Sequence, residues 1–370
     1  MMESMNGRSL GWIALGLATA ECPKSIPRVL ARFVDPLEAL HCSEEEMRGL
    51  GFGQETAGSL ASGRFHDMAA KEVARLARLG GRVVSFEDQG YPGLLKQIPD
   101  PPFVLYGLGE IETLNGPAVG IVGSRHPTPY GRGVATSLSR ELAGRRLVVV
   151  SGLAEGIDSC AHLGALDSGR TVAVLGTGLD IVYPRQNRGL ATSISASGCL
   201  VTEFPLGAPP AGFHFPQRNR LISGLCLALV VVEASMQSGS LITARLALEQ
   251  NREVLAVPGN IISPLSCGTN ELIQAGAKPA TCWQDVVEEL PEAVREAAYA
   301  AGRTDSGRAS SLGREERQVL GCLRPDGIVH IDEIAVRSDV PLPNLLAVLL
   351  DMELRGLVRQ SPGKFYQRSV

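Results

Sequence analysis

The sequence predicts an α/β protein built around a doubly wound, mainly parallel sheet. From about residue 82 onward, short β-branched runs alternate with Gly-rich turns and helical segments, which is the order of elements in such sheets. Some runs, such as residues 229–232, are continuously apolar and therefore need helices on both faces. The 370 residues exceed one domain of roughly 100 to 200 residues, so flanking domains are expected.

The sheet is predicted within residues 69–290. Its candidate strands are residues 82–86, 118–122, 147–150, 171–175, 200–203, 227–232 and 254–257. Ligands of doubly wound sheets bind beyond the carboxyl ends of the strands. The residues that directly follow each run are therefore the first candidates for a functional site.

Residues 1–68 are predicted to form a small helical domain. Four apolar residues can share one helical face: Leu37, Leu40, Met47 and Leu50. A Gly-rich turn at residues 49–53 then precedes a second helix over residues 54–62. This arrangement is similar to a SAM or helix-hairpin-helix domain, whose amides can contact a phosphate. A plain helical cap on the next domain is the interpretation that we favour.

Residues 10–20 are apolar and end in a sequence that looks like a signal-peptidase site. Glu3 offsets Arg8 ahead of this run, and Gly11 and Gly16 interrupt it, so we expect the first helix of a domain instead. No other apolar run approaches the roughly 20 residues needed to span a bilayer, and no membrane segment is predicted.

Residues 291–313 are weakly helical and then Gly- and Ser-rich, which predicts a linker.

Residues 314–370 resemble a winged helix. The expected elements are helices over residues 314–323, 331–338 and 342–355 and a hairpin over residues 357–366. Winged helices contact DNA in some proteins and protein partners in others, and the sequence leaves both open.

Composition excludes several classes of site. The net charge is −4, so nucleic acid would have to meet a local basic patch. The eight cysteines lack metal-ligand spacing and are expected to be reduced, mostly buried thiols of a cytosolic protein. Neither a P-loop nor a dinucleotide G-x-G-x-x-G fingerprint is present, so no cofactor and no metal are predicted.

Glycines and small hydroxyl residues follow several predicted strands. These groups are Gly123-Ser124-Arg125, then Ser151-Gly152, and then Ser238, Gly239, Ser240 and Thr243 at the start of a predicted helix. Amides, hydroxyls and the positive end of a helix dipole all favour an anion. Because the carboxyl ends of parallel strands share one edge, these loops are predicted to form one anion-binding rim.

Two further segments add basic and aromatic side chains near this rim. They contain Arg185 and Arg188, and Phe215, Arg218, Asn219 and Arg220. A ring beside arginines offers a stacking face for a base and donors for its backbone. The alternative, that Phe213 and Phe215 lie in the core and the arginines form structural ion pairs, is equally compatible with the segment.

Asp158 and His162 are four residues apart and could face each other on a helix as an acid–base pair. A helix cap with an ordinary ion pair is the interpretation that we favour. No G-x-S-x-G motif of a serine hydrolase is present.

Taken in order, these segments resemble the DprA (Smf) family of DNA-processing proteins. The matching runs include Gly123-Ser124-Arg125, Ser151-Gly152-Leu153-Ala154, Phe215-Pro216, Arg218-Asn219-Arg220, Ser238-Gly239-Ser240-Leu241 and Gly268-Thr269-Asn270. The series spans about residues 80–290 and is far more specific than any single run. The flanking domains also look like those of the longer members.

The resemblance implies an extended Rossmann-like domain in a cytosolic, non-catalytic homodimer. It implies that this domain binds single-stranded DNA and loads RecA recombinase onto it in recombination and natural transformation. By motif, the DNA strand would contact Arg125, Arg185, Phe215, Arg218 and Arg220, and Arg188 and Asn219 would lie nearby. The neutral hydrogen-bond donors would be Gly123, Ser124, Ser151, Gly152, Ser238, Gly239, Ser240 and Thr243. Ile273 is the expected interface residue.

One departure from the family pattern affects the expected site. Members often carry Lys where this sequence has Gly212, so one phosphate contact is expected to be lost or taken over by a neighbour such as Arg188.

Two other functions are alternatives to DNA binding. Related Rossmann proteins hydrolyse nucleoside monophosphates with a P-G-G-x-G-T-x-x-E segment, but residues 237–244 lack its glutamate. A protein-binding adaptor is the third possibility.

Overall fold

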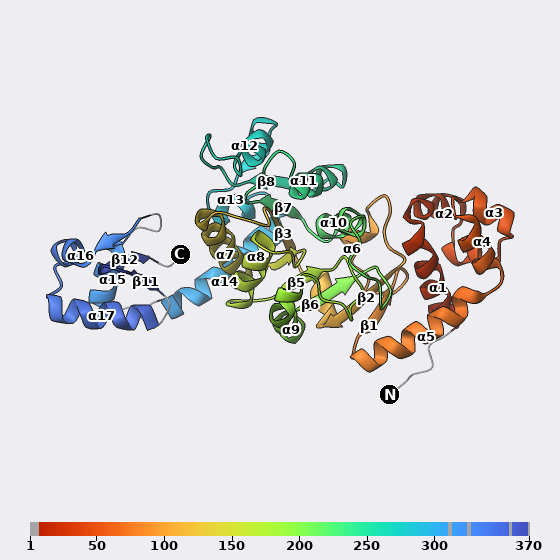
Figure 1. The fold of residues 1–370 in the computed structure, drawn as a ribbon, viewed down its shortest axis with the longest axis horizontal. Coiled ribbons are helices and arrows are strands. Elements are labelled where there is room, and N and C mark those ends of the chain that lie inside the picture. Colours follow the sequence, from red (N-terminus) through yellow and green to blue (C-terminus); the bar gives the residue numbers. More distant parts are fainter. Residues whose placement is uncertain (1–6, 310–312, 324–326, 355–356, 369–370) are drawn as a thin grey trace. The chain divides into compact units, whose positions relative to one another are not determined.

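The computed structural model describes residues 7–309, 313–323, 327–354 and 357–368 and divides into two compact units (Figure 1). The first unit ends at Ala298 and the second begins at Tyr299. The first holds an N-terminal group of helices and a nine-stranded sheet, and the second holds a three-stranded sheet with its own helices.

Short helices form the N-terminal group: α1 (Gly7–Glu21), η1 (Pro23–Ser25), α2 (Ile26–Arg32), η2 (Pro36–His41), α3 (Glu44–Gly49), α4 (Gln54–Ala61) and α5 (Arg64–Leu79). The expected second helix after the Gly-rich turn is α4. The prediction of one helical face from Leu37 to Leu50 is wrong, because two caps divide the segment. Asp35 caps η2, and Ser43 and Glu46 form a capping box at the start of α3.

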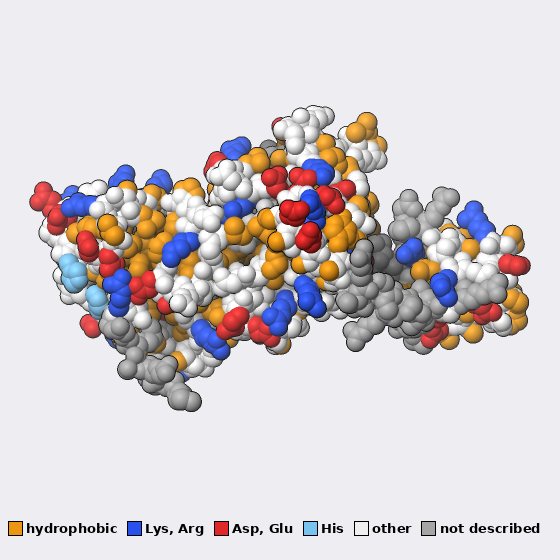
Figure 2. All heavy atoms as spheres, turned by 180° about the vertical axis from the view of Figure 1, so that it is seen from behind, with side chains coloured by type: hydrophobic (Ala, Val, Ile, Leu, Met, Phe, Trp, Pro, Cys, Tyr) orange, Lys and Arg blue, Asp and Glu red, His pale blue; other side chains and the backbone are white. Residues whose placement is uncertain are grey.

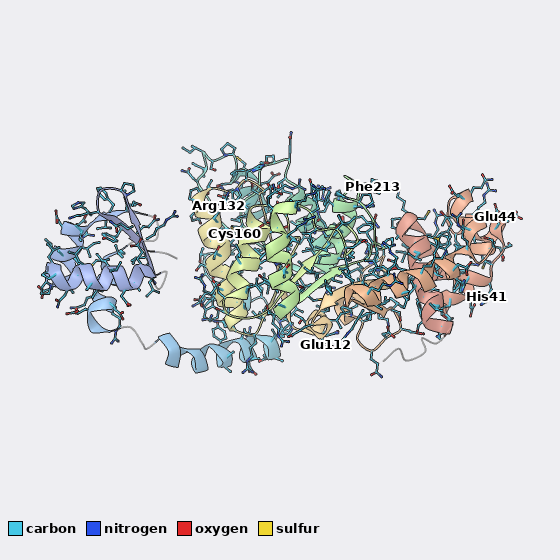
Figure 3. All side chains as sticks on the ribbon, turned by 60° about the horizontal axis from the view of Figure 1, so that its bottom comes forward. His41, Glu44, Glu112, Arg132, Cys160 and Phe213 are labelled. Atoms are coloured by element: carbon cyan, nitrogen blue, oxygen red, sulfur yellow. The ribbon has the colours of Figure 1, made fainter. Side chains whose placement is uncertain are left out.

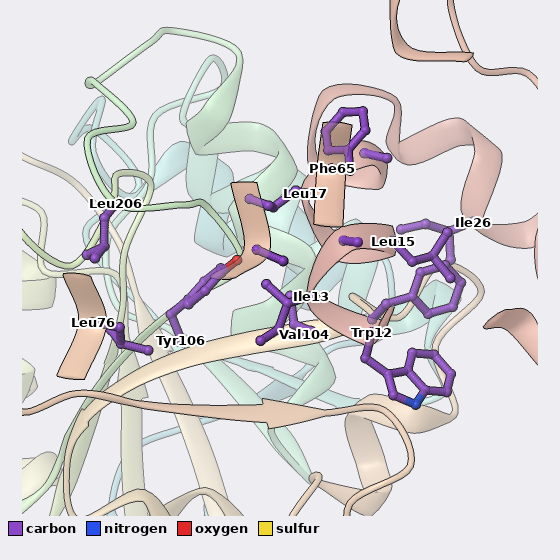
Figure 4. Packing of buried hydrophobic residues seen from close by; sticks show 14 of the residues in the cluster. Trp12, Ile13, Leu15, Leu17, Ile26, Phe65, Leu76, Val104, Tyr106 and Leu206 are labelled. Carbon is purple, nitrogen blue, oxygen red and sulfur yellow. The ribbon is translucent and has the colours of Figure 1, made fainter. Parts of the chain in front are cut away.

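Helix α1 confirms the helix predicted over residues 10–20, and it packs directly on the sheet (Figure 4). Its Trp12 is 1% exposed and lies 5.7 Å from Phe103, centroid to centroid. Its Gly16 faces Val104 so closely that a Cβ would overlap the valine side chain. One hydrophobic cluster thus joins these helices to the sheet, and α5 runs across the boundary predicted at residue 68.

The sheet has the order β1-β2-β6-β5-β4-β3-β7-β8-β9. Its strands are β1 (Arg82–Ser85), β2 (Val104–Gly109), β3 (Ala118–Val122), β4 (Val148–Ser151), β5 (Thr171–Val174), β6 (Cys199–Thr202), β7 (Ala228–Val231), β8 (Glu253–Ala256) and β9 (Lys278–Pro279). Each neighbouring pair in the series β6-β5-β4-β3-β7-β8-β9 is parallel, whereas β2 is antiparallel to both β1 and β6. The predicted strands are confirmed to within about one residue. The sequence pattern missed β2, whose run Gly107 and Gly109 interrupt, and the two-residue β9.

The chain reverses direction across the sheet between β3 and β7. It adds β4, β5 and β6 on one side of β3 and then returns to place β7 on the other side. The crossover helices α7 (Pro129–Gly144), α8 (Ile157–Leu166) and α9 (Arg188–Ser197) cover one face, and α10 (His214–Gly224) and α11 (Gly239–Glu249) cover the other. The loops that leave β3 and β7 therefore diverge, which opens a crevice at the carboxyl edge.

The remaining helices are α6 (Gly93–Lys96), η3 (Ile111–Asn115), η4 (Arg185–Asn187), α12 (Cys267–Gln274), α13 (Trp283–Val287) and α14 (Glu292–Ala309). Helix α14 occupies most of the predicted linker, residues 291–313, and the division between the units falls within it.

The second unit has α15 (Arg314–Cys322), β10 (Val329–His330), α16 (Ile331–Ser338), α17 (Leu342–Leu354), β11 (Val358–Ser361) and β12 (Phe365–Arg368). The three predicted helices and the hairpin are thereby confirmed.

The cysteines are free, but the prediction that most are buried is wrong. Cys199 and Cys226 are buried, four others are partly exposed, and Cys267 and Cys282 are exposed. Within the described ranges, no three or more His, Cys, Asp or Glu residues are grouped to hold a metal ion. The same ranges contain no helix that is long and apolar enough to cross a membrane.

We expect Gly16→Ala to destabilise the protein by about 1 to 3 kcal/mol, because the new methyl group must displace Val104 of β2. Gly58→Ala in α4 is the matched control, since the nearest atom to its Cβ would be 3.6 Å away, on Glu44. That control should stabilise the protein by up to about 1 kcal/mol, because alanine favours helix. Urea-induced unfolding measures both, and equal effects of the two variants would contradict the close packing of α1 on β2.

Candidate nucleic-acid interface

A groove of about 530 Å³ lies at the carboxyl edge of the sheet, where the loops after β3 and β7 diverge. Ten residues of the predicted site line it: Gly123, Ser124, Arg125, Phe215, Arg218, Asn219, Ser238, Gly239, Ser240 and Thr243. Gly152 lines a smaller pocket of about 160 Å³, which shares Arg125, Phe215 and Arg218 with the groove. The topology thus gathers residues that are up to 120 positions apart in the sequence.

Neighbouring groups fix the loop after β3. The Ser124 N–H donates to the Glu233 carbonyl oxygen at 2.7 Å, and the Ser124 hydroxyl oxygen accepts from the His126 N–H at 3.1 Å. A Cβ on Gly123 would lie 2.7 Å from Ile157 Cγ1, so glycine is needed for the close approach of α8. The Ser124 amide is therefore engaged within the fold and is not one of the free donors that the sequence pattern predicted.

Helix α11 contributes its first turn to the groove. Ser238 is the N-cap and accepts from the Ser240 N–H at 3.3 Å, and the two hydroxyl oxygens are 2.7 Å apart. Gly239 is exposed, and no atom lies within 4 Å of where its Cβ would be. This open helix start, with the positive end of the helix dipole, favours an anion.

Arg125 is an exposed cation in the groove. Its guanidinium lies over the Phe215 ring, 5.8 Å from the centroid. The Phe215 ring also lies 5.5 Å from the Tyr183 ring and packs on Gly176, where a Cβ would be 2.9 Å from Phe215 Cδ1. A cation over an aromatic face is attracted to the ring, and the guanidinium keeps N–H donors that a phosphate can accept.

Arg218 lies beneath the groove rather than on its surface, with only 5% of the residue exposed. Its guanidinium donates to the carbonyl oxygens of Gly152, at 2.7 Å, and of Val174. Glycine is needed at position 152, because a Cβ there would lie 2.6 Å from Arg218 Nη2. Burial lowers the pKa of Arg218 to about 10 although Asp158 opposes the shift, so the group remains a cation at neutral pH.

Asp158 and His162 do not form the acid–base pair that their spacing allowed. The Asp158 carboxylate accepts from the N–H groups of Gly152, at 3.1 Å, and Ala154, at 3.3 Å. His162 is fully buried, and its Nδ1 lies 2.7 Å from the Thr171 hydroxyl, which itself donates to a backbone carbonyl. His162 therefore donates from Nδ1, and burial lowers its pKa to about 3, which keeps the ring neutral.

Several predicted residues are not brought into the groove. Arg220 is 4% exposed and forms an ion pair with Glu203. Its Nε also lies 3.2 Å from an Asp100 carboxylate oxygen. This arginine is therefore a structural ion-pair partner, as the alternative interpretation of the segment had it. Ser151 is buried and donates to the Ile121 carbonyl oxygen at 2.6 Å. Both side chains complete internal polar contacts that a strand of DNA could not replace.

Arg185 and Arg188 are exposed at η4 and the start of α9, beside Tyr183 and Pro184 of the smaller pocket. The alternative that both phenylalanines of residues 213–215 lie in the core is wrong. Phe213 is 72% exposed, and Phe215 is partly exposed in the groove. Phe213 is not among the predicted site residues, because the family motif in this segment begins at Phe215.

Charges of both signs are mixed on the face of the protein that Figure 2 shows. Such a surface does not attract DNA as a whole, in keeping with the net charge of −4. Any attraction of the groove for an anion is local and comes from Arg125 at its surface and from the start of α11, because Asp158, which also lines the groove, offsets the buried Arg218.

Comparison with known proteins decides the family. The family model for DNA recombination-mediator protein A matches residues 82–291, more than half of the chain. The chain belongs to the DprA family. The model of the DprA winged helix domain also matches residues 304–364, which identifies the second unit. DprA proteins are DNA-processing, DNA-binding proteins, and the fold here is the Rossmann-like sheet of that family with a winged helix after it.

The DNA processing protein DprA of Bacillus subtilis is 42% identical over 231 residues, which are 62% of this chain and 78% of that protein. The X-ray structure of DprA from Streptococcus pneumoniae superposes with a TM-score of 0.66 at 34% identity, covering 78% of this chain and 99% of that one. A structure of DprA from Helicobacter pylori, described for its single-stranded DNA binding mode, gives a TM-score of 0.52 at 31% identity and covers 57% of this chain and 98% of that one.

The buried His162 makes the stability of this protein depend on pH in a defined direction. Its folded pKa is about 3 and its unfolded pKa about 6.5, so below pH 6.5 only the unfolded chain takes up this proton. We expect His162→Gln to reduce the loss of stability between pH 6.5 and 4.5 by up to about 1.4 kcal/mol per pH unit. Unfolding by urea at several pH values measures this loss.

His66→Gln is the control for the substitution itself, because it makes the same exchange at an exposed histidine. Parallel stability curves for wild type and His162→Gln would show that His162 is not held neutral.

Proposed function

We propose that this protein binds single-stranded DNA along the groove and loads RecA recombinase onto it, without catalysing a reaction itself. The observation that carries the binding proposal is the open groove at the crossover of β3 and β7, where Arg125 lies on Phe215 opposite the start of α11. Neutral donors and a few cations along an open groove suit a chain of phosphates better than one small nucleotide. The H. pylori relative, whose structure is described for single-stranded DNA binding, supports the proposal.

Loading of RecA, a role in recombination and transformation, and a cytoplasmic location rest on membership of the family. Of the predicted DNA-contacting residues, we propose that the nine others that line the groove with Arg218, together with Arg185 and Arg188, face the strand. Arg218 and Gly152 are buried and bonded to each other, so they would support the groove from beneath. Ser151 and Arg220 would act indirectly by holding the strand ends and α10. Release of free base from nucleoside monophosphates would instead favour the glycosidase alternative.

Wild-type protein is expected to bind labelled oligo-dT more tightly than a duplex of equal length, with an affinity that falls as salt rises. Arg125→Ala should weaken binding about equally for different sequences and reduce the slope of log affinity against log salt by about one unit, as for one lost phosphate contact. Fluorescence anisotropy at several salt concentrations measures both quantities.

Arg82→Ala is the matched control, because it removes the same charge at the opposite edge of the sheet. Arg82 pairs with Glu112 at 3.1 Å, and Figure 3 shows Glu112 on the far side of the sheet domain from Phe213. Unchanged binding by Arg125→Ala, or equal losses in the two variants, would contradict the groove as the binding site.

We propose that the protein forms a homodimer through α11, α12 and the loop before α11. Met236, Ile242 and Leu248 are 47 to 58% exposed there, around a largely apolar groove that Leu272 also lines. Ile273, the predicted interface residue, is partly exposed on α12 beside this surface. Exposed apolar side chains gathered in this way are typical of protein interfaces.

Ile273→Glu is expected to shift the protein from dimer to monomer, because the interface would have to bury an unpaired charge. Leu163→Glu is the control, since Leu163 is 53% exposed on α8, on the other face of the sheet. Light scattering across micromolar concentrations measures the mass. A monomeric wild type, or a dimeric Ile273→Glu variant, would exclude this interface.

In the second unit, the surface of one helix favours contact with a protein partner over contact with DNA. Helix α17 is the third helix of the winged helix, and it carries no Lys or Arg. Its Leu342, Leu346 and Leu350 are 46 to 59% exposed and follow one another every fourth residue along one side. We propose that this unit contacts protein, since an apolar helix face offers a DNA backbone neither charge nor donors.

A further inference from the structure

Phe213 is a large aromatic side chain left 72% exposed beside the groove. It occupies the N-cap position of α10, and Gly212 and Phe215 on either side of it both line the groove. Figure 3 shows Phe213 at the margin of the sheet domain. Phe213 does not itself line the groove, so its exposed ring belongs to the surface directly next to it.

The Phe213 ring rests against an anchored support. Its neighbour His214 meets it edge to face at 4.6 Å, and His214 in turn stacks on Phe204 at 4.1 Å. Phe204 is 2% exposed, and His214 Nδ1 lies 3.1 Å from the Pro209 carbonyl oxygen. A buried ring and a hydrogen bond thus hold the histidine against which the exposed ring leans.

Phe213 is more exposed than Phe215, which neighbouring groups already contact. The Phe213 residue is 72% exposed. The Phe215 ring, in contrast, has Gly176, Tyr183 and the Arg125 guanidinium around it. Of the two rings, Phe213 has the more accessible surface for a flat ligand.

We propose that Phe213 stacks on a nucleobase of the bound single strand and is a contact additional to Phe215. This inference rests on the proposed function and names a base subsite within it. A phosphate groove fixes the backbone, and a held aromatic ring beside it adds stacking that any base can provide. The subsite accordingly recognises the presence of a base and not its identity.

The test compares two ligands that share one backbone: oligo-dT, and an oligonucleotide of equal length made of abasic sites. Phe213→Ala should bind oligo-dT about five- to a hundredfold more weakly and bind the abasic strand as wild type does. Phe213→Trp should retain oligo-dT binding, and its fluorescence should be quenched by oligo-dT and not by the abasic strand. Wild-type protein supplies the background of the two native tryptophans.

Arg125→Ala is the comparison variant, because loss of a phosphate contact weakens both ligands alike. A wild type that does not bind oligo-dT overturns the proposed function and this inference with it. A wild type that binds, combined with a Phe213→Ala variant that matches it on oligo-dT or that loses equal affinity for both strands, overturns the stacking role alone.

Discussion

A single buried guanidinium links the parts of the groove. Arg218 extends from α10 to the carbonyl oxygens of Gly152 and Val174, which lie at the ends of β4 and β5. Carbonyl groups at such ends have no further strand to pair with, so the arginine supplies the donors that they would otherwise lack. Asp158 lies close enough to favour the charged arginine and accepts the amides of the loop after β4. Removal of Arg218 would leave several buried polar groups unpaired at once, and with them the position of α10.

That position determines what the groove offers to a ligand. Because α10 is held against the strand ends, its first turn places Phe215 under the Arg125 guanidinium, and Phe213 next to the groove. The opposite wall comes from α11, whose start lies across the crossover between β3 and β7. The groove therefore combines one exposed cation, one buried cation, a helix start and aromatic rings, on a protein whose net charge is negative. The attraction to phosphate is local, and salt is expected to weaken it strongly.

The N-terminal helices and the winged helix differ in how they relate to the sheet. Helix α1 shares a hydrophobic cluster with β2, and its Gly16 permits contact between the helix and Val104. The N-terminal helices therefore form part of the same compact unit as the sheet. The winged helix has a separate core, centred on Leu345, Leu349 and Met352 of α17. Its exposed leucines follow the same helix on the solvent side, which is why we assign it a protein contact.

The sequence by itself determined the seven main strands, the helices of the winged helix and the family, since short apolar runs and ordered loop motifs are local signals. It missed β2, because Gly107 and Gly109 interrupt the apolar run of a strand that pairs with both β1 and β6. The sequence also could not distinguish the roles of Arg125, Arg218 and Arg220, because each is an arginine in a motif of the predicted site. Only the tertiary structure placed the first on the surface, the second under the groove and the third in an ion pair with Glu203. The reason is physical: the environment of a charged side chain depends on the segments that pack around it, and here those segments are distant in the sequence.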